Sequence, residues 1–315
     1  MNHAFDNLIE TKVESPAIRE MMRYAIDGGK RLRPILFLCM IPDKNPRDYF
    51  DVCLGLELMH TCSLVLDDLP CMDDDKERRG RPAFHIQFGE VRAKLFVSYC
   101  MYFSMKLIRE KQLDKNCMRL IANMVYRNMG ACGACTGQFL DLCPIMPHTN
   151  KKEFIEQYSS KEGLQELLNL KTTTFFQLGF QGGYILNLDS RKSTDSQLDY
   201  FENDPIRKKI EEMTNDFGFA FQLFDDFDDI QQDYERKRDG EFTPNFILTY
   251  GLDASKNLYE HHMNQFIETY TDIICGDTSH ICYQLVSEIR EYLTSNVYKR
   301  YDEITPELKA RLNSF

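Results

Sequence analysis

The sequence predicts an all-α protein. Apolar side chains recur every three or four residues through 54–66, 90–109 and 206–230, the period of a helix with one buried face. Alternating patterns typical of strands are few and short. Because the composition is 43% hydrophobic and 28% charged, and no linker or repeat divides the chain, we expect a single domain spanning residues 1–315.

Turn-forming residues divide the chain into about ten predicted helices. Loops are expected at Pro42–Pro46, 144–150, 187–205 and 234–244. Asp204 and Pro205 fit the cap and first turn of the third long helix. The apolar faces of the three long helices consist of Leu54, Leu58, Cys62 and Val65; Leu95, Tyr99, Tyr102 and Met105; and Ile210, Met213, Phe217, Phe221 and Phe224.

Composition limits the possible partners and compartment. A net charge of −11 and a pI of about 5.2 argue against a nucleic-acid partner. No apolar run reads as long enough to cross a bilayer, so we expect no membrane span. The first seven residues lack a signal or transit pattern, and a cytoplasmic location is expected. The eleven cysteines read as reduced thiols; Cys132 and Cys135 have the spacing of half a zinc site, but no second pair follows.

The first chemical signal is a cluster of aspartates, Asp67, Asp68 and 73–75, that follows an apolar run. Pro70 disfavours helical geometry at the residue before it, so Asp67 and Asp68 should end a helix and Asp73 can fold back towards them. Carboxylates at a helix C-terminus oppose the helix dipole. A bound cation would remove that conflict.

A second cluster, Asp225, Asp226 and 228–229, ends the apolar face of the third long helix. Asp225 and Asp229 are four residues apart, so they share one helix face. Carboxylates crowded beside apolar surface repel one another and lose hydration unless a cation joins them. Mg²⁺ suits such oxygen donors and usually completes its shell with water and substrate phosphates. The two clusters therefore predict a magnesium-bridged diphosphate site at the mouth of an apolar cavity.

Basic residues form compact groups around these clusters. Lys30, Arg31 and Arg33 follow a glycine pair at 28–29, and arginine supplies paired donors for phosphate oxygens. Arg78 and Arg79 follow the first cluster directly. Any one such group alone is more often a solvated surface patch. The order of these groups around two acidic clusters favours diphosphate binding instead.

Six stretches together resemble the trans-isoprenyl diphosphate synthases. They are GGKRLRP at 28–34, ELMHTCSLVLDDLPCMDDDKERRGRP at 57–82, FGE at 88–90, GQFLDL at 137–142, KT at 171–172 and FGFAFQLFDDFDD at 217–229. The resemblance implies the isoprenoid-synthase fold, a bundle of antiparallel helices around a deep apolar cavity, and a homodimer. It also implies condensation of an allylic diphosphate with isopentenyl diphosphate.

The resemblance assigns roles to individual residues. The expected Mg²⁺ ligands are Asp67, Asp73 and Asp225, supported by Asp229, Asp68 and Asp226. The residues expected to face the allylic diphosphate are Arg78, Lys171 and Gln222, with Thr172 near the carbon that ionises. The residues expected to hold isopentenyl diphosphate are Lys30, Arg33, His60 and Arg79.

Product length is expected to depend on the helix that precedes the first cluster. Fifteen-carbon synthases often carry an aromatic ring five positions before the first aspartate, where this chain has Cys62 followed by Ser63. Their small side chains favour a twenty-carbon product, geranylgeranyl diphosphate. Phe96, Tyr99 or Phe103 could form a deeper floor or stop growth at farnesyl diphosphate.

Two departures from the family pattern leave other functions open. Glu241 stands where the family has a lysine, for which Lys237 or Arg238 could substitute, and the segment 91–100 is bulkier than usual. These changes are compatible with a catalytically weak regulatory subunit. A terpene cyclase of the same fold is disfavoured by the 28–34 stretch, which serves a second diphosphate.

Overall fold

The computed structural model describes residues 1–111, 113–142, 150–188, 203–238, 243–274 and 280–313, and helices dominate these residues. Their strands are limited to one short hairpin, β1 (Glu77–Arg78) and β2 (Arg81–Pro82). The helical elements in chain order are α1 (Asn2–Lys12), α2 (Pro16–Ile26), α3 (Leu32–Cys39), the 3-10 turn η1 (Pro46–Tyr49), α4 (Phe50–Asp67), α5 (Phe84–Phe88), α6 (Glu90–Glu110), α7 (Lys115–Met129), α8 (Ala134–Leu142), α9 (Lys151–Tyr158), α10 (Lys161–Leu168), the π-helical turn η3 (Asn169–Thr173), α11 (Thr174–Asn187), α13 (Pro205–Arg238), α14 (Phe246–Tyr250), α15 (Leu252–Ile273), α16 (Ile281–Glu303) and α17 (Pro306–Leu312). The all-α prediction is confirmed.

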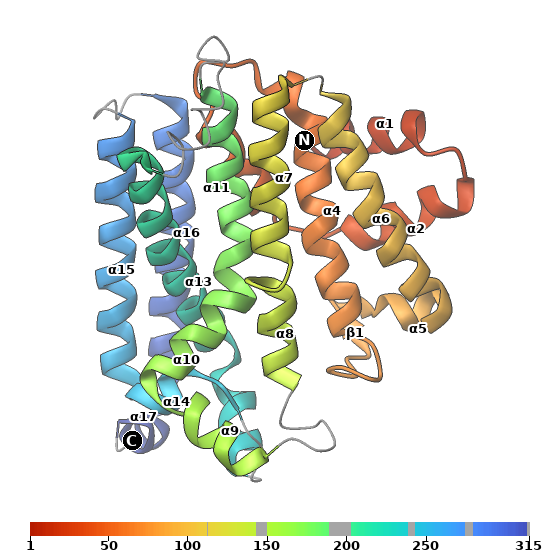
Figure 1. Cartoon of the computed structure of the whole chain (residues 1–315). Coiled ribbons are helices and arrows are strands. Elements are labelled where there is room, and N and C mark those ends of the chain that lie inside the picture. Colours follow the sequence, from red (N-terminus) through yellow and green to blue (C-terminus); the bar gives the residue numbers. More distant parts are fainter. Residues whose placement is uncertain (112, 143–149, 189–202, 239–242, 275–279, 314–315) are drawn as a thin grey trace.

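The long helices run side by side as a bundle (Figure 1). One hydrophobic cluster is built mainly on α4, α6 and α7, and a second on α13, α15 and α16. Helices α3 and α11 contribute to both: Phe37 and Phe175 belong to the first cluster, and Leu36 and Phe176 to the second. These two central helices therefore join the two halves of the core.

Helix α4 is apolar around most of its circumference. Together with η1 it forms a 22-residue segment, Pro46–Asp67, that contains an 18-residue window with a mean hydropathy of 1.3. By length and composition this segment could cross a membrane, so the prediction that no apolar run is long enough was wrong. However, 61% of the apolar window is buried within the protein, and a core helix passes the same test. Packing on both sides of α4 accounts for its composition.

The three long helices predicted from periodicity are present as α4, α6 and α13. The face predicted to be buried on α6 was wrong, because Leu95 and Tyr102 are exposed and the buried face instead carries Phe96, Cys100 and Phe103.

Helix α13 begins at Pro205, and Asp204 Oδ1 accepts a hydrogen bond from Ile206 N at 2.9 Å, as expected for a cap. The sequence predicts a loop over 234–244. Its first part, up to Arg238, is instead helical, because α13 continues to that residue. No proline or glycine interrupts this stretch, and three basic residues in its last turn complement the helix dipole.

The described residues contain more helices than the predicted ten, because short ones such as α5, α14 and α17 were not separated from their neighbours. The predicted loops at 144–150 and 187–205 fall largely on 143–149 and 189–202, which lie outside the described residues. Glu241 lies outside them as well.

Candidate functional site

The first carboxylate cluster has the geometry that Pro70 predicts. Helix α4 ends at Asp67, and the chain turns so that Asp73 N donates to Asp67 O at 2.9 Å. Burial raises the pKa of Asp67 to about 7, and the neighbouring Asp73 adds to that shift. Asp68 is buried and accepts a hydrogen bond from Arg78 Nε at 2.9 Å. Asp67 and Asp73 are thus crowded together, while Asp68 orients an arginine.

Lys171 approaches the first cluster from η3. Its Nζ pairs with Asp141 Oδ2 of α8 at 2.5 Å. Burial lowers the pKa of Lys171, but Asp141 and Asp67 outweigh that effect, so the pKa lies above its usual value. Asp141 lies in the stretch 137–142, but sequence reasoning gave it no role, because only folding brings it within reach of Lys171.

The π-helical turn η3 is held from two sides. A Cβ on Gly137 would lie 2.5 Å from Lys171 N, and a Cβ on Gly218 would lie 2.3 Å from Thr173 Oγ1. The glycines therefore permit α8 and α13 to press against this turn. Turns of this kind often occur at functional sites because they redirect side chains.

A hydrogen-bonded chain leads from η3 to the second cluster. Thr172 Oγ1 donates to Gln222 Oε1 at 2.9 Å, and Gln222 Nε2 donates to Asp226 Oδ1 at 2.9 Å. Asp226 Oδ2 also accepts a hydrogen bond from Phe246 N at 2.7 Å. Burial raises the pKa of Asp226 to about 8. Asp226 thus ties α13 to α14 and orients Gln222.

Asp225 and Asp229 remain available on the other face of α13. Burial raises the pKa of Asp225 to about 7, against the opposing influence of Lys30. Burial also raises the pKa of Asp229, and the positive charge of Arg78 opposes that shift. Arg78 acts in the same way on Asp67. One cation therefore influences both clusters, which indicates that they flank a shared space.

Two buried side-chain nitrogens near the clusters lack hydrogen-bond partners within the described part of the chain. They are Arg33 Nε and His60 Nδ1. The Arg33 guanidinium lies 4.5 Å from the centroid of the Phe176 ring, and burial lowers its pKa to about 10, so it stays charged. Burial and Arg33 hold the pKa of His60 well below its usual value. Buried polar atoms without partners are costly, and an anionic ligand would satisfy Arg33 Nε, and His60 Nδ1 when that nitrogen carries the proton.

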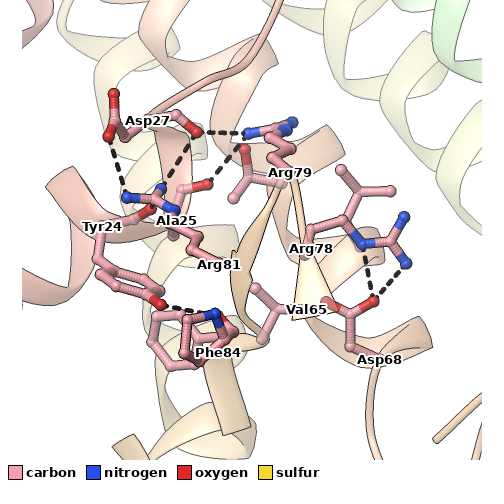
Figure 2. A pocket seen from close by; sticks show the side chains of 12 residues that line it. Tyr24, Ala25, Asp27, Val65, Asp68, Arg78, Arg79, Arg81 and Phe84 are labelled. Atoms are coloured by element: carbon pink, nitrogen blue, oxygen red, sulfur yellow. Dashed lines mark hydrogen bonds and ion pairs between the residues drawn. The ribbon is translucent and has the colours of Figure 1, made fainter. Parts of the chain in front are cut away.

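The β1–β2 hairpin places its arginines on different sides (Figure 2). Arg78 points to Asp68 and also pairs with Asp75 Oδ2 at 3.1 Å. Arg79, whose φ is 56°, donates from Nη1 to the Asp27 carbonyl at 3.0 Å. Arg81 Nη1 pairs with the Asp27 carboxylate at 2.9 Å. Arg79 therefore lies against the Gly28–Gly29 turn, and Arg78 lies by the first cluster.

Arg31 does not join the other cations of the 28–34 stretch. Its Nη1 pairs with Glu57 Oε1 at 2.6 Å, and its Nε donates to Asn2 Oδ1 at 3.0 Å. Both side chains of the ion pair are buried. This pair anchors the turn that carries Lys30. Lys237, suggested above as a substitute for a family lysine, donates to the Leu248 carbonyl at 2.8 Å.

The residues expected to control product length lie on α4 and α6. Cys62 Sγ donates to the Val97 carbonyl at 3.7 Å, at the contact between α4 and α6. Ser63 lies three residues after His60 and four before Asp67, so it shares their face of α4. The Phe96 ring of α6 stacks on the Phe84 ring of α5, with the centroids 4.6 Å apart. Within α6 the Tyr99 and Phe103 rings stack with their centroids 5.7 Å apart.

A polar cavity of about 280 Å³ lies between α7, α11 and α13. Its lining is mostly amide and hydroxyl, including Asn123, Thr174 and Gln177, and it contains none of the predicted site residues. Arg207 at this cavity already pairs with Glu211 at 3.0 Å. The cavity therefore lacks the carboxylate clusters that the predicted chemistry requires.

The donor set at the two clusters fits Mg²⁺ bound together with a diphosphate. Within the described ranges, no three histidine, cysteine or acidic side chains converge on one point as a complete metal site. Mg²⁺ takes one or two carboxylates and fills its remaining positions with water and phosphate oxygens. Crowded carboxylates beside cations, in an all-helical bundle, are the arrangement expected of a metal-dependent diphosphate-binding protein.

Comparison with known proteins agrees with this class. The polyprenyl synthetase family model matches residues 15–241. The farnesyl diphosphate synthase of Bacillus subtilis (strain 168) is 30% identical over 268 residues, which are 81% of this chain and 82% of that protein. Geranylgeranyl pyrophosphate synthase 4 of Arabidopsis thaliana is 29% identical over 272 residues, 82% of this chain and 67% of that protein. The chain belongs to the polyprenyl synthetase family.

Solved structures share the fold. A farnesyl/geranylfarnesyl diphosphate (FPP/GFPP) synthase from Zymomonas mobilis superposes with a TM-score of 0.74 at 24% identity, over 93% of this chain and 95% of that one. A geranyltransferase from Helicobacter pylori, solved with magnesium and isoprenyl diphosphate, gives a TM-score of 0.68 at 24% identity, over 94% of this chain and 95% of that one.

Proposed function

We propose that this protein is a Mg²⁺-dependent short-chain prenyltransferase that makes geranylgeranyl diphosphate from isopentenyl diphosphate and an allylic diphosphate. The observation that carries the proposal is the grouping of cations with both carboxylate clusters. Lys171 and Arg78 act electrostatically on Asp67, and Lys30 and Arg33 act on Asp225. The relatives that catalyse such reactions support the same reading.

The side chains divide into three roles in this proposal. Asp67, Asp73 and Asp225, with Asp229, would hold Mg²⁺, which when bound neutralises charge on the departing diphosphate. Arg78, Lys171 and Gln222 bind the allylic diphosphate by charge-assisted and polar hydrogen bonds. Lys30, Arg33, His60 and Arg79 hold isopentenyl diphosphate.

The reaction breaks the allylic carbon–oxygen bond and forms a carbon–carbon bond to isopentenyl diphosphate, and a proton then leaves to the released diphosphate. Thr172 follows Lys171 in the chain, and its hydroxyl donates to Gln222 Oε1 at 2.9 Å. In this proposal the Thr172 hydroxyl lies beside the carbon that ionises. In this proposal the buried rings of Phe175 and Phe176 supply apolar surface that keeps water from the allylic carbocation.

The experiment that tests the function supplies purified protein with isopentenyl diphosphate, Mg²⁺ and each allylic diphosphate in turn, and identifies products by mass spectrometry. Small side chains at Cys62 and Ser63 favour a twenty-carbon product. Farnesyl diphosphate as the sole product would instead fit the Bacillus subtilis relative and a stop at Phe96 or Tyr99. Absence of any turnover would favour a regulatory subunit.

We also propose a homodimer. Val91, Leu95 and Tyr102 are 73%, 66% and 78% exposed. They recur at four and seven residues and so form one apolar stripe on α6, which a second copy would cover. Leu95→Glu should convert the dimer to a monomer in light scattering. Ile281→Glu, an equally polar change at an exposed apolar residue of α16, should leave it intact.

A further inference from the structure

Helix α16 reaches the candidate site, although it lies beyond the residues 15–241 matched by the family model. The Tyr292 ring lies 5.6 Å from Lys30 Nζ, and the Phe224 ring lies 5.0 Å from the same atom. The two ring centroids are 6.5 Å apart. The Lys30 ammonium is therefore held between an aromatic residue of α13 and one of α16.

This contact leaves the hydrogen-bonding capacity of Lys30 intact. Within the described part of the chain, Lys30 makes no ion pair, and its ammonium makes cation–π contacts with these two rings. Aromatic rings attract an ammonium through their negative faces and do not use up its three N–H donors as carboxylates do. Phe224 directly precedes Asp225, so the rings hold the charge beside the second cluster.

A second contact fixes α16 in place. Arg300 Nη2 and Nε lie 2.6 Å and 2.7 Å from Asp228 Oδ1. Arg300 thereby engages Asp228, while Asp225 and Asp229 make no ion pair within the described residues. The helix that carries Tyr292 is thus attached to α13 immediately beside Lys30 and Asp225.

We infer that Tyr292 is a positioning residue that, together with Phe224, holds the Lys30 ammonium ready for the diphosphate of isopentenyl diphosphate. This inference rests on the proposed function and extends it to the C-terminal part of the chain. Tyr292 itself does not touch the substrate. It reduces the freedom of a flexible side chain before the substrate arrives, which lowers the entropic cost of binding.

The test measures binding of isopentenyl diphosphate by calorimetry, without allylic substrate, together with KM for both substrates and kcat. Tyr292→Leu should weaken isopentenyl diphosphate binding about two- to fivefold, the range for a partly exposed cation–π contact. The KM for the allylic diphosphate should stay unchanged. Tyr292→Phe, which keeps the ring, should restore the affinity.

Two controls separate positioning from a structural effect. Tyr298→Leu removes another exposed tyrosine of α16, whose hydroxyl bonds to Glu260 at 2.8 Å, and should leave affinity unchanged. In a Lys30→Met background, Tyr292→Leu should cause no further loss. Equal affinity of wild type and Tyr292→Leu, or the same loss in the Lys30→Met background, would overturn the inference alone. A wild-type protein that binds no isopentenyl diphosphate would overturn the proposed function and the inference with it.

Discussion

Replacing Glu57 by alanine leaves the Arg31 guanidinium buried without its carboxylate. The two side chains are 2% and 10% exposed, and their N–O distance is 2.6 Å. Breaking such a pair by removing one partner costs about 3–5 kcal/mol. For a chain of this size each kcal/mol lowers the melting temperature by about 2 °C, so Glu57→Ala should lower it by about 6–10 °C.

The same change should also disturb substrate binding. A Cβ on Gly29 would lie 2.2 Å from Arg31 Nη1 and 2.6 Å from Glu57 Oε1, so the ion pair packs directly on the turn before Lys30. Loss of the pair frees this turn, and KM for isopentenyl diphosphate should rise.

The assay is thermal unfolding followed by circular dichroism, with two comparison variants. Lys12→Ala breaks an ion pair of 2.7 Å whose side chains are 30% and 39% exposed, and it should cost about 0–1 kcal/mol. Arg31→Met combined with Glu57→Leu removes both charges and should recover most of the lost stability. A Glu57→Ala protein that melts within about 2 °C of Lys12→Ala would refute the argument from burial.

Three further predictions concern the reaction. Asp67→Ala and Asp225→Ala should each lower turnover by orders of magnitude while the helical content stays unchanged. A chelator should abolish turnover of the wild type. Near-normal turnover in either variant would contradict the metal assignment. Arg79→Ala should mainly raise KM for isopentenyl diphosphate and Arg78→Ala that for the allylic substrate, each by about ten- to hundredfold for a lost charge-assisted contact. Identical effects on both substrates would show that the hairpin does not divide them. Cys62→Phe should shift the product from twenty towards fifteen carbons, because a ring at the α4–α6 contact overpacks this wall; unchanged product lengths would remove Cys62 from it.

Local rules explain the part of the fold that the sequence predicts correctly. The end of α4 at Asp67 follows from the restriction that Pro70 places on its neighbour, and the return of Asp73 follows from the turn. The start of α13 at Pro205 follows from the cap at Asp204. Each involves residues within a few positions of one another, so no tertiary knowledge is needed.

Long-range pairings explain what the sequence could not predict. Lys171 meets Asp141 across 30 positions, and Arg31 meets Glu57 across 26. Both carboxylates lie in stretches that resemble the family, but nothing local in the sequence names the cation that each one meets. Similarly, Tyr292 is one of sixteen tyrosines and has no motif, and only the packing of α16 brings it to Lys30.

The site contains side chains that a carboxylate partner positions and side chains that make no ion pair among the described residues. Arg31, Lys171 and Arg78 have carboxylate partners in Glu57, Asp141 and Asp68.

By contrast, Asp67, Asp225, Lys30 and Arg33 make no ion pair among the described residues, although Lys30 and Arg33 both act electrostatically on Asp225. Direct pairing of these acids and bases would offset the effect of burial, which raises the pKa of Asp67 and Asp225. Their separation is unfavourable for the protein alone and suits a bound cation together with a bound diphosphate, since the acids then contact the metal and the bases contact the phosphate oxygens.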